Sequence, residues 1–385
     1  MPGLSSISEL LKRATDAGDV PGVAVSVATP DGVAFESAAG RRALPDGAAM
    51  APDTIVRIAS MTKAVTGACA MQMVEQGKLE LDSPIGRLLP ELGAAKVLEG
   101  YDADGKPRLR DPKRPITLRH LLTHTSGHTY DTWNATNGEY RARSGMPHPR
   151  SGLRASLSIP LLFDPGDKWE YSISIDWAGL AVEQASGLKL ADYMQRNLFD
   201  PLGMHDTGFR LNDGQRKRLA SVYLRNAEGL TPFTRDPPEN PEFDAGGGGL
   251  FSTVQDYTKF GQMILNKGRF NGAQVLKPAT VELMSQNAMG DINVRTLPAV
   301  VPTLTNTVDF IDGMKWGLTF LINPKPLATG RSAGSLAWAG LMNSYYWIDP
   351  VKKVTGVYAT QILPFCDVKS LKLFQDFEAA VYREM

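Results

Sequence analysis

Two residues that could share one chemical step stand three positions apart near the start of the chain, in the sequence Ser60-Met-Thr-Lys63. They follow the short apolar run 54–59, so we expect a strand that leads into a helix. Residues three apart on a helix lie on one face, which puts the hydroxyl beside the amine. The field of a helix N-terminus, together with partial burial, would lower the pKa of Lys63. A serine activated by a neighbouring lysine can carry out acyl transfer.

The S-x-x-K pattern is short, and a helix-capping serine followed by a solvated lysine is its structural alternative. Two later stretches add weight to the catalytic interpretation. Tyr171 stands in Glu-Tyr-Ser-Ile173, and Trp338 stands in Trp-Ala-Gly340 on a predicted strand. Each aromatic residue alone is typical of core packing. Together, in this order, the three motifs favour one shared site.

With the run 121–127 and the glycines 246–249, this combination resembles the serine β-lactamase and penicillin-binding-protein superfamily. Within it, the chain is most similar to the family VIII carboxylesterases, which resemble class C β-lactamases. The resemblance covers nearly the whole chain. It implies that Ser60 is the acylated nucleophile, with Lys63 as its general-base partner and Tyr171 sharing the proton transfer. Because Lys63 and Tyr171 would titrate as a coupled pair, the residue that takes the Ser60 proton stays open. The oxyanion hole implied is the backbone N–H of Ser60 and of Leu341.

The chain departs from the superfamily at two motif positions, and both departures concern substrate binding. Trp338-Ala-Gly340 stands where β-lactamases keep Lys-Thr-Gly, so a cation is replaced by apolar area and one N–H donor. Ile173 stands where they have asparagine, and it cannot hydrogen-bond a substrate amide. Gly340 would let substrate approach the strand closely. We therefore expect Trp338, Gly340 and Ile173 to contact largely apolar esters of short to medium chain length.

These residues predict a serine carboxylesterase that works through an acyl-enzyme on Ser60, without cofactor or metal. An acyltransferase, in which an alcohol replaces water, uses the same three residues and is the first alternative. A weak β-lactamase or D-amino-acid peptidase is a further one. A non-catalytic binding relative is disfavoured by the intact Ser60, Lys63 and Tyr171.

Three other patterns are interpreted as structural. Gly330-Arg-Ser332-Ala-Gly334 matches the nucleophile elbow of α/β-hydrolases, but a strand follows the serine and every histidine precedes it. His120 and His124 lack the H-E-x-x-H arrangement of a zinc site. The glycine run 246–249 lacks phosphate-binding context, so we expect a mobile loop near the site.

The elements that must position these residues fall into two groups. Strand-like stretches occur at 23–28 and 33–35, and again at 316–322, 336–348 and 354–363. The intervening chain favours helices and loops, including a short helix that Gly127 would close. We predict an α+β, β-lactamase-like fold: an antiparallel sheet domain from 1–78 and 310–385, flanked by helices, and a mostly helical domain from 79–309. The active site would lie in the seam.

Composition gives no sign of a charged partner. The 41 basic and 41 acidic residues balance, which disfavours nucleic acid and anionic membranes. The first residues lack a signal-peptide pattern, and no apolar run reaches transmembrane length. We expect a cytoplasmic protein whose partner is a small-molecule ester; oligomeric state is not predicted.

Overall fold

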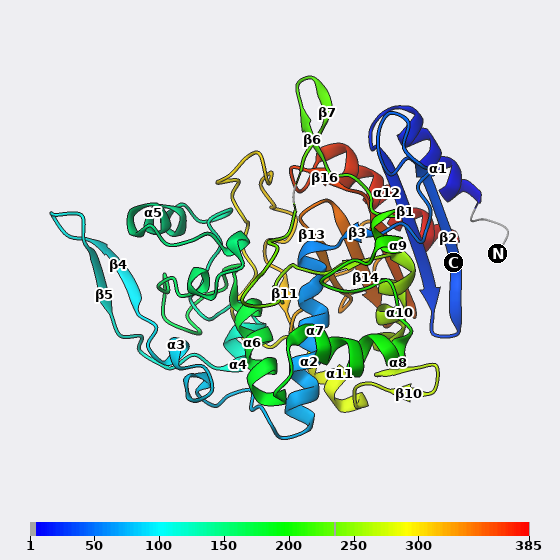
Figure 1. Ribbon diagram of the computed structural model, residues 1–385. Helices are drawn as coiled ribbons and strands as arrows, with labels where there is room; N and C mark the ends of the chain where they lie inside the picture. Colours follow the sequence, from blue (N-terminus) through cyan, green and yellow to red (C-terminus); the bar gives the residue numbers. More distant parts are fainter. Residues whose placement is uncertain (1–4, 235, 385) are drawn as a thin grey trace.

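A seven-stranded antiparallel sheet is built from both ends of the chain and occupies one half of the molecule (Figure 1). The computed structural model describes residues 5–234 and 236–384. Neighbouring strands follow the order β11-β12-β13-β14-β15-β1-β2. The predicted α+β class, with helices flanking such a sheet, is confirmed. The strands are β1 Gly22–Thr29, β2 Gly32–Gly40, β11 Lys315–Trp316, β12 Leu321–Ile322, β13 Leu336–Gly340, β14 Ser344–Asp349 and β15 Val354–Ala359.

Alternation along β14 buries different helices on the two faces of the sheet, because successive strand side chains point to opposite faces. The ring of Tyr345 stacks on Phe374 of α12 (Val368–Glu384), with centroids 4.4 Å apart. The ring of Tyr346 lies 5.0 Å from that of Tyr257 on α10 (Val254–Leu265). The first helix, α1 (Ser5–Asp16), packs against β2 and α12. The sheet therefore separates the terminal helices from α10.

A second, mostly helical region surrounds α2 (Thr62–Glu75), which packs against α6 and α7. Small side chains and glycine make this approach close, and α2 is buried on nearly all sides. The other helices of this region are α3 Pro90–Gly93, α4 Leu118–Leu122, α5 Ala135–Ser144, α6 Ser174–Ser186, α7 Leu190–Met194, α8 Asp200–Leu202, α9 Asp213–Arg216 and α11 Pro278–Met284. Short strand pairs are β3 Val56–Arg57 with β8 Phe251–Ser252, β4 Val97–Tyr101 with β5 Pro107–Arg110, β6 Tyr223–Asn226 with β7 Gly229–Pro232, and β9 Arg269–Phe270 with β10 Ala273–Gln274; β16 Ile362–Leu363 joins β6.

Several predicted boundaries are wrong. The stretches 316–322, 336–348 and 354–363 each form two strands, because the chain turns inside them. Asn343 sits in the left-handed region (φ 58°) between β13 and β14, a conformation that asparagine tolerates better than most residues. Helix α4 ends at Leu122 with Thr123 as its C-cap, so Gly127 does not close it. Gly127 is instead needed for space, since a Cβ there would lie 2.4 Å from the Phe163 carbonyl oxygen.

The proposed domain ranges stay a prediction, and parts of them (1–4, 235 and 385) lie outside the described residues. One element inside the range 79–309 belongs to the sheet by contact: α10 packs on β15 and β1. Within the described chain, none of the helices combines the length and apolar character needed to cross a bilayer.

Candidate active site

Ser60 lies on a tight turn between β3 and α2. Residues Ala59–Met61 form a single 3₁₀ turn, and α2 starts only at Thr62. Ser60 therefore lies at the predicted strand-to-helix junction, in the turn before the α-helix, and the alternative of a helix-capping serine is wrong. Ala59 has φ 44°, which is uncommon for a residue with a Cβ and is a form of strain that occurs at functional sites. The turn leaves Ser60 half-buried while its neighbours on both sides are buried.

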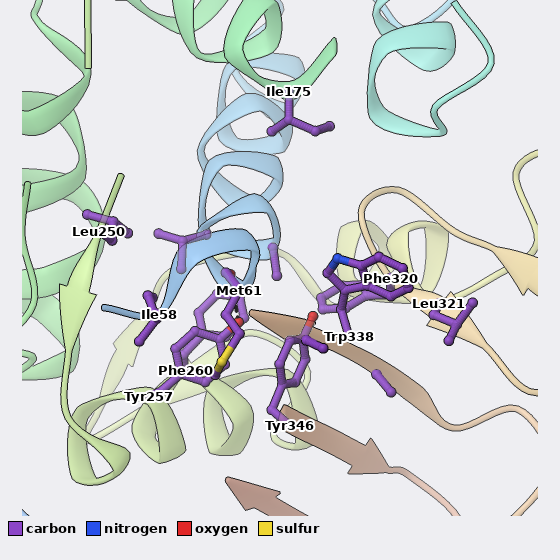
Figure 2. Packing of buried hydrophobic residues seen from close by; sticks show 14 of the residues in the cluster. Ile58, Met61, Ile175, Leu250, Tyr257, Phe260, Phe320, Leu321, Trp338 and Tyr346 are labelled. Atoms are coloured by element: carbon purple, nitrogen blue, oxygen red, sulfur yellow. Dashed lines mark hydrogen bonds between the residues drawn. The ribbon is translucent and has the colours of Figure 1, made fainter. Parts of the chain in front are cut away.

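An apolar layer supports this turn from below. Ile58 and Met61 flank it, and Figure 2 shows both near Tyr257, with Trp338 and Tyr346 on the strands of the sheet. The Tyr257 hydroxyl donates a hydrogen bond to the Met61 carbonyl at 2.8 Å. The apolar packing of Ile58 and Met61, together with this hydrogen bond, fixes the backbone that carries Ser60.

Lys63 is fully buried, and its amine has three polar neighbours. The Nζ atom lies 3.1 Å from Ser60 Oγ and 3.2 Å from the Tyr130 hydroxyl, and it donates to the Gly247 carbonyl. Burial lowers the pKa of Lys63 to about 7, against the opposing charge of Asp176. A lysine with this pKa is partly neutral near pH 7 and can accept a proton from Ser60. The predicted lowering of the Lys63 pKa agrees with this value.

Tyr171 precedes α6 and reaches the same centre. Its hydroxyl hydrogen-bonds with Ser60 and accepts the indole N–H of Trp338 at 2.9 Å. The Lys63 amine lies 4.7 Å from the centroid of the Tyr171 ring. Burial raises the pKa of Tyr171 well above that of an exposed phenol, and the hydrogen bonds from its partners oppose this only in part. At neutral pH Tyr171 is therefore a neutral phenol that can relay a proton.

Tyr130 is a member of the site that sequence reasoning missed. Its hydroxyl contacts Lys63, and its ring lies 5.4 Å from that of Tyr171. Burial also raises its pKa. No helical or strand periodicity marked Tyr130 as a site residue, because it stands in an irregular stretch. The one available signal was its place three residues after Gly127, at the end of a recognised motif.

The end of β13 packs against the Ser60 turn. A Cβ on Gly340 would lie 2.3 Å from the Ile58 carbonyl oxygen, so glycine is required for the strand to come this close. Leu341, the next residue, packs in a small apolar cluster with Ala59. Strand and turn thus bring the backbones of Ser60 and Leu341 into one region. The oxyanion hole formed by their N–H groups stays a prediction.

Ile173 is placed differently from the other predicted substrate-binding residues. It is the N-cap residue of α6, and its side chain is 1% exposed within the main core. The polar contacts at this helix start come from its neighbours: the hydroxyls of Ser172 and Ser174 each lie 3.1 Å from His124 Nδ1. A direct contact between Ile173 and substrate stays a prediction, and its burial argues for packing.

Of the residues interpreted as structural, His124 packs beside Tyr171, with ring centroids 4.7 Å apart, but takes up no further proton at neutral pH. Burial holds the pKa of His124 well below its usual range, so the ring is neutral, while His120 bonds the Thr117 backbone. Among the described residues, no group of three or more His, Cys, Asp or Glu side chains could hold a metal ion. The Ser332 N–H donates to Asp349, and β13 follows it, so the strand-serine-helix context of a nucleophile elbow is missing.

The glycine run lies beside the site, and hydrogen bonds tie its backbone to two helices. Gly247 accepts from Lys63 and donates to Asp176 at 2.8 Å, and the Gly246 carbonyl accepts the Thr66 hydroxyl at 2.7 Å. These contacts fix the position of the run in the structure, whereas its predicted mobility stays a prediction.

Comparison with known proteins identifies the family. The Beta-lactamase family profile matches residues 7–376, so the chain belongs to the beta-lactamase family. It is 32% identical to monacolin J acid methylbutanoyltransferase of Aspergillus terreus over 357 residues, which cover 86% of this chain and 83% of that protein. It is 31% identical to lovastatin esterase of Penicillium rubens, with 97% of both chains covered. The structure of unliganded simvastatin synthase from Aspergillus terreus superposes with a TM-score of 0.88 at 30% identity, covering 100% of this chain and 99% of that one. The predicted membership of the serine β-lactamase superfamily and its fold are confirmed.

Proposed function

We propose that this protein is a serine acyltransferase that forms an acyl-enzyme on Ser60 and passes the acyl group to an alcohol, with hydrolysis of the same ester as its competing reaction. The observation that carries the proposal is the buried Lys63 amine, 3.1 Å from Ser60 Oγ, with a pKa of about 7. This revises the emphasis of the sequence prediction, which put hydrolysis first.

The proton path follows from the two pKa directions. Lys63 is the better resting base, because burial lowers its pKa and raises that of Tyr171. As Ser60 Oγ bonds to the ester carbonyl carbon, its proton passes to Lys63. The ammonium then returns a proton, through the neighbouring tyrosine hydroxyls, to the departing alkoxide. In deacylation an incoming alcohol gives its proton to Lys63 while Ser60 Oγ leaves and is reprotonated.

Transfer is supported over hydrolysis by the character of the site and by its relatives. The catalytic centre is walled by aromatic rings: Trp133 lies 5.2 Å and Trp338 4.9 Å from the Tyr171 ring, all three nearly fully buried. Dry surroundings limit the access of water to an acyl-enzyme. Among the relatives reported above, monacolin J acid methylbutanoyltransferase is named for acyl transfer and lovastatin esterase for ester cleavage.

The substrate is proposed to be a neutral, largely apolar ester. Partly buried apolar side chains lie with Ala59 at the Ser60 turn, namely Leu224, Phe233, Leu304 and Leu341. A cavity of about 510 Å³ is lined by Trp133 and Trp169 together with 295–298, and we propose that it holds part of a larger alcohol. Membership of the family VIII carboxylesterases, a cytoplasmic location and action without a cofactor belong to the same proposal.

The test measures p-nitrophenyl butyrate turnover with and without a competing alcohol, in wild type and Ser60→Ala. We expect Ser60→Ala to lose activity, an active-site phosphonate to label Ser60, and added alcohol to divert acyl groups into a new ester. Ser332→Ala is the matched control and should keep full activity. Activity retained in Ser60→Ala, or a label on Ser332, would overturn the assignment. A labelled Ser60 with no ester product would leave hydrolysis as the function.

A further inference from the structure

A carboxylate lies one glycine away from the Lys63 amine. Asp176, in the first turn of α6, is 5% exposed and accepts the Gly247 N–H through Oδ1 at 2.8 Å. The carbonyl of the same glycine accepts a hydrogen bond from Lys63 Nζ. Gly247 is therefore hydrogen-bonded to both groups, and its backbone couples the position of the Asp176 carboxylate to that of the Lys63 amine.

The spacing depends on the absence of a side chain at Gly247. A Cβ there would lie 2.7 Å from Asp176 Oδ2 and 3.0 Å from Oδ1, so any larger residue must displace the carboxylate or the loop. The neighbouring Gly246 carbonyl is held by Thr66, one turn along α2 from Lys63. The glycine run is thus bonded to the helix that carries the base and to the helix that carries the acid.

The charge of Asp176 reaches Lys63 without a direct ion pair. The titratable groups around the amine are the Tyr130 hydroxyl, the Tyr171 phenol, the His124 ring and Asp176, contributed by two stretches of chain, 124–130 and 171–176. Both phenols are held neutral by burial, and so is His124. Asp176 is the carboxylate in this set. Burial raises its pKa, the Lys63 charge and the Gly247 N–H oppose this, and its negative charge raises the Lys63 pKa against the effect of burial.

We propose that Asp176 is a positioning residue for the reaction: through Gly247 it fixes the Lys63 amine against Ser60, and by its charge it sets the lowest pH at which the site works. The inference rests on the acyl-enzyme function proposed above. The effect of the Asp176 charge on the working pH range has a predicted direction. Without the carboxylate, Lys63 loses its proton more readily and stays neutral to lower pH.

The experiment compares pH profiles of kcat/KM for p-nitrophenyl butyrate in wild type and Asp176→Asn. The asparagine oxygen can still accept the Gly247 N–H, so the variant removes the charge and keeps the hydrogen bond. We expect the acid limb to move down by about one pH unit, with a plateau close to that of wild type. Asp256→Asn is the matched control. Asp256 is a buried carboxylate at the corresponding position in the first turn of α10, and its removal should leave the limb in place.

Gly247→Ala tests whether Asp176 positions the Lys63 amine through Gly247. It also keeps this test available if Asp176→Asn does not fold. Its added methyl displaces the carboxylate but keeps the charge, so we expect the plateau to fall by about tenfold or more with little change in the limb. Gly248→Ala is its control, because a Cβ there meets its nearest atom at an ordinary 3.8 Å.

An unchanged acid limb in folded Asp176→Asn overturns the charge part, and an unchanged plateau in folded Gly247→Ala overturns the positioning part. Failure of this inference is distinct from failure of the proposed function. If only this inference fails, wild type is still labelled at Ser60 and Ser60→Ala is inactive. If the proposed function fails, Ser60→Ala stays active.

Discussion

The indole N–H of Trp338 donates a hydrogen bond to the hydroxyl of Tyr171 at 2.9 Å. This contact joins β13 of the sheet to the segment that opens α6, and so it crosses the boundary between the two groups of elements. It also gives a structural role to Trp338, which the sequence resemblance places where the superfamily motif has a lysine. The side chain gives the phenol a neutral donor and lies over it with ring centroids 4.9 Å apart.

Trp338→Phe removes this donor and keeps most of the apolar area. We expect kcat for p-nitrophenyl butyrate to fall by about three- to tenfold, the range that corresponds to one neutral hydrogen bond. Trp347→Phe is the matched control, because its buried indole N–H has no hydrogen-bond partner in the described chain and its ring faces α12. Equal rates for the two variants would remove Trp338 from the proton network.

Tyr130→Phe tests the residue that the sequence did not reveal. Loss of its hydroxyl leaves the Lys63 amine with one polar neighbour fewer, so we expect kcat to fall by about tenfold while the protein stays folded. Tyr101→Phe, in β4 and remote from Ser60, should match wild type. An unaffected Tyr130→Phe would show that Tyr171 relays the proton alone.

The pH profile of the wild type follows from the Lys63 pKa of about 7. The base must be neutral to accept the Ser60 proton, so kcat/KM should fall as pH decreases through this value and level off above it. Burial holds the Tyr171 pKa above the usual phenol range, so its ionisation should not add a limb near neutrality. An acid limb near pH 4 to 5 would instead point to a carboxylate as the base.

The buried Lys63 amine should lower the free energy of unfolding as well as serve as the catalytic base. Its folded pKa of about 7 lies below the unfolded value of 10.5, so the unfolded chain binds more protons between these two pH values. Stability due to this group therefore rises with pH across that window, and below pH 7 the cost is at its largest. We expect Lys63→Met to be inactive but more stable at pH 6, by roughly 2 kcal/mol after lost hydrogen bonds are subtracted.

The measurement is urea unfolding of Lys63→Met at pH 6 and pH 9, beside Lys12→Met, which changes an exposed lysine. The gain should shrink at the higher pH. A Lys63→Met protein that is less stable than wild type at both pH values would contradict a costly buried amine.

Gly340→Ala tests the approach of β13 to the nucleophile turn. The new methyl would meet the Ile58 carbonyl oxygen at 2.3 Å, so strand and turn must separate. We expect a loss of about 100-fold in kcat, the scale of one lost oxyanion donor. Gly138→Ala, where a Cβ is 3.8 Å from its nearest neighbour, is the control in α5. Full activity in Gly340→Ala would separate β13 from catalysis.

Several features were determined by the sequence alone, because each depends on local spacing. The three-residue separation of Ser60 and Lys63 predicts that both share one face, and they do so in the structure because the 3₁₀ turn 59–61 runs directly into α2. The strand-like stretches 23–28 and 33–35 correspond to β1 and β2, which pair as neighbours in the sheet. The motif order was enough to indicate the superfamily and its sheet built from both termini.

Tertiary structure alone decided the rest. Tyr130 contacts Lys63 from 67 positions away, and Asp176 is linked to it through Gly247; no local pattern encodes such relationships. Only the fold shows that Ile173 is 1% exposed at the start of α6, and its contact with substrate stays a prediction. The pKa of Lys63 likewise depends on burial by distant elements: an amine that is ordinary in the unfolded chain becomes a base near neutral pH only when the fold removes water from around it.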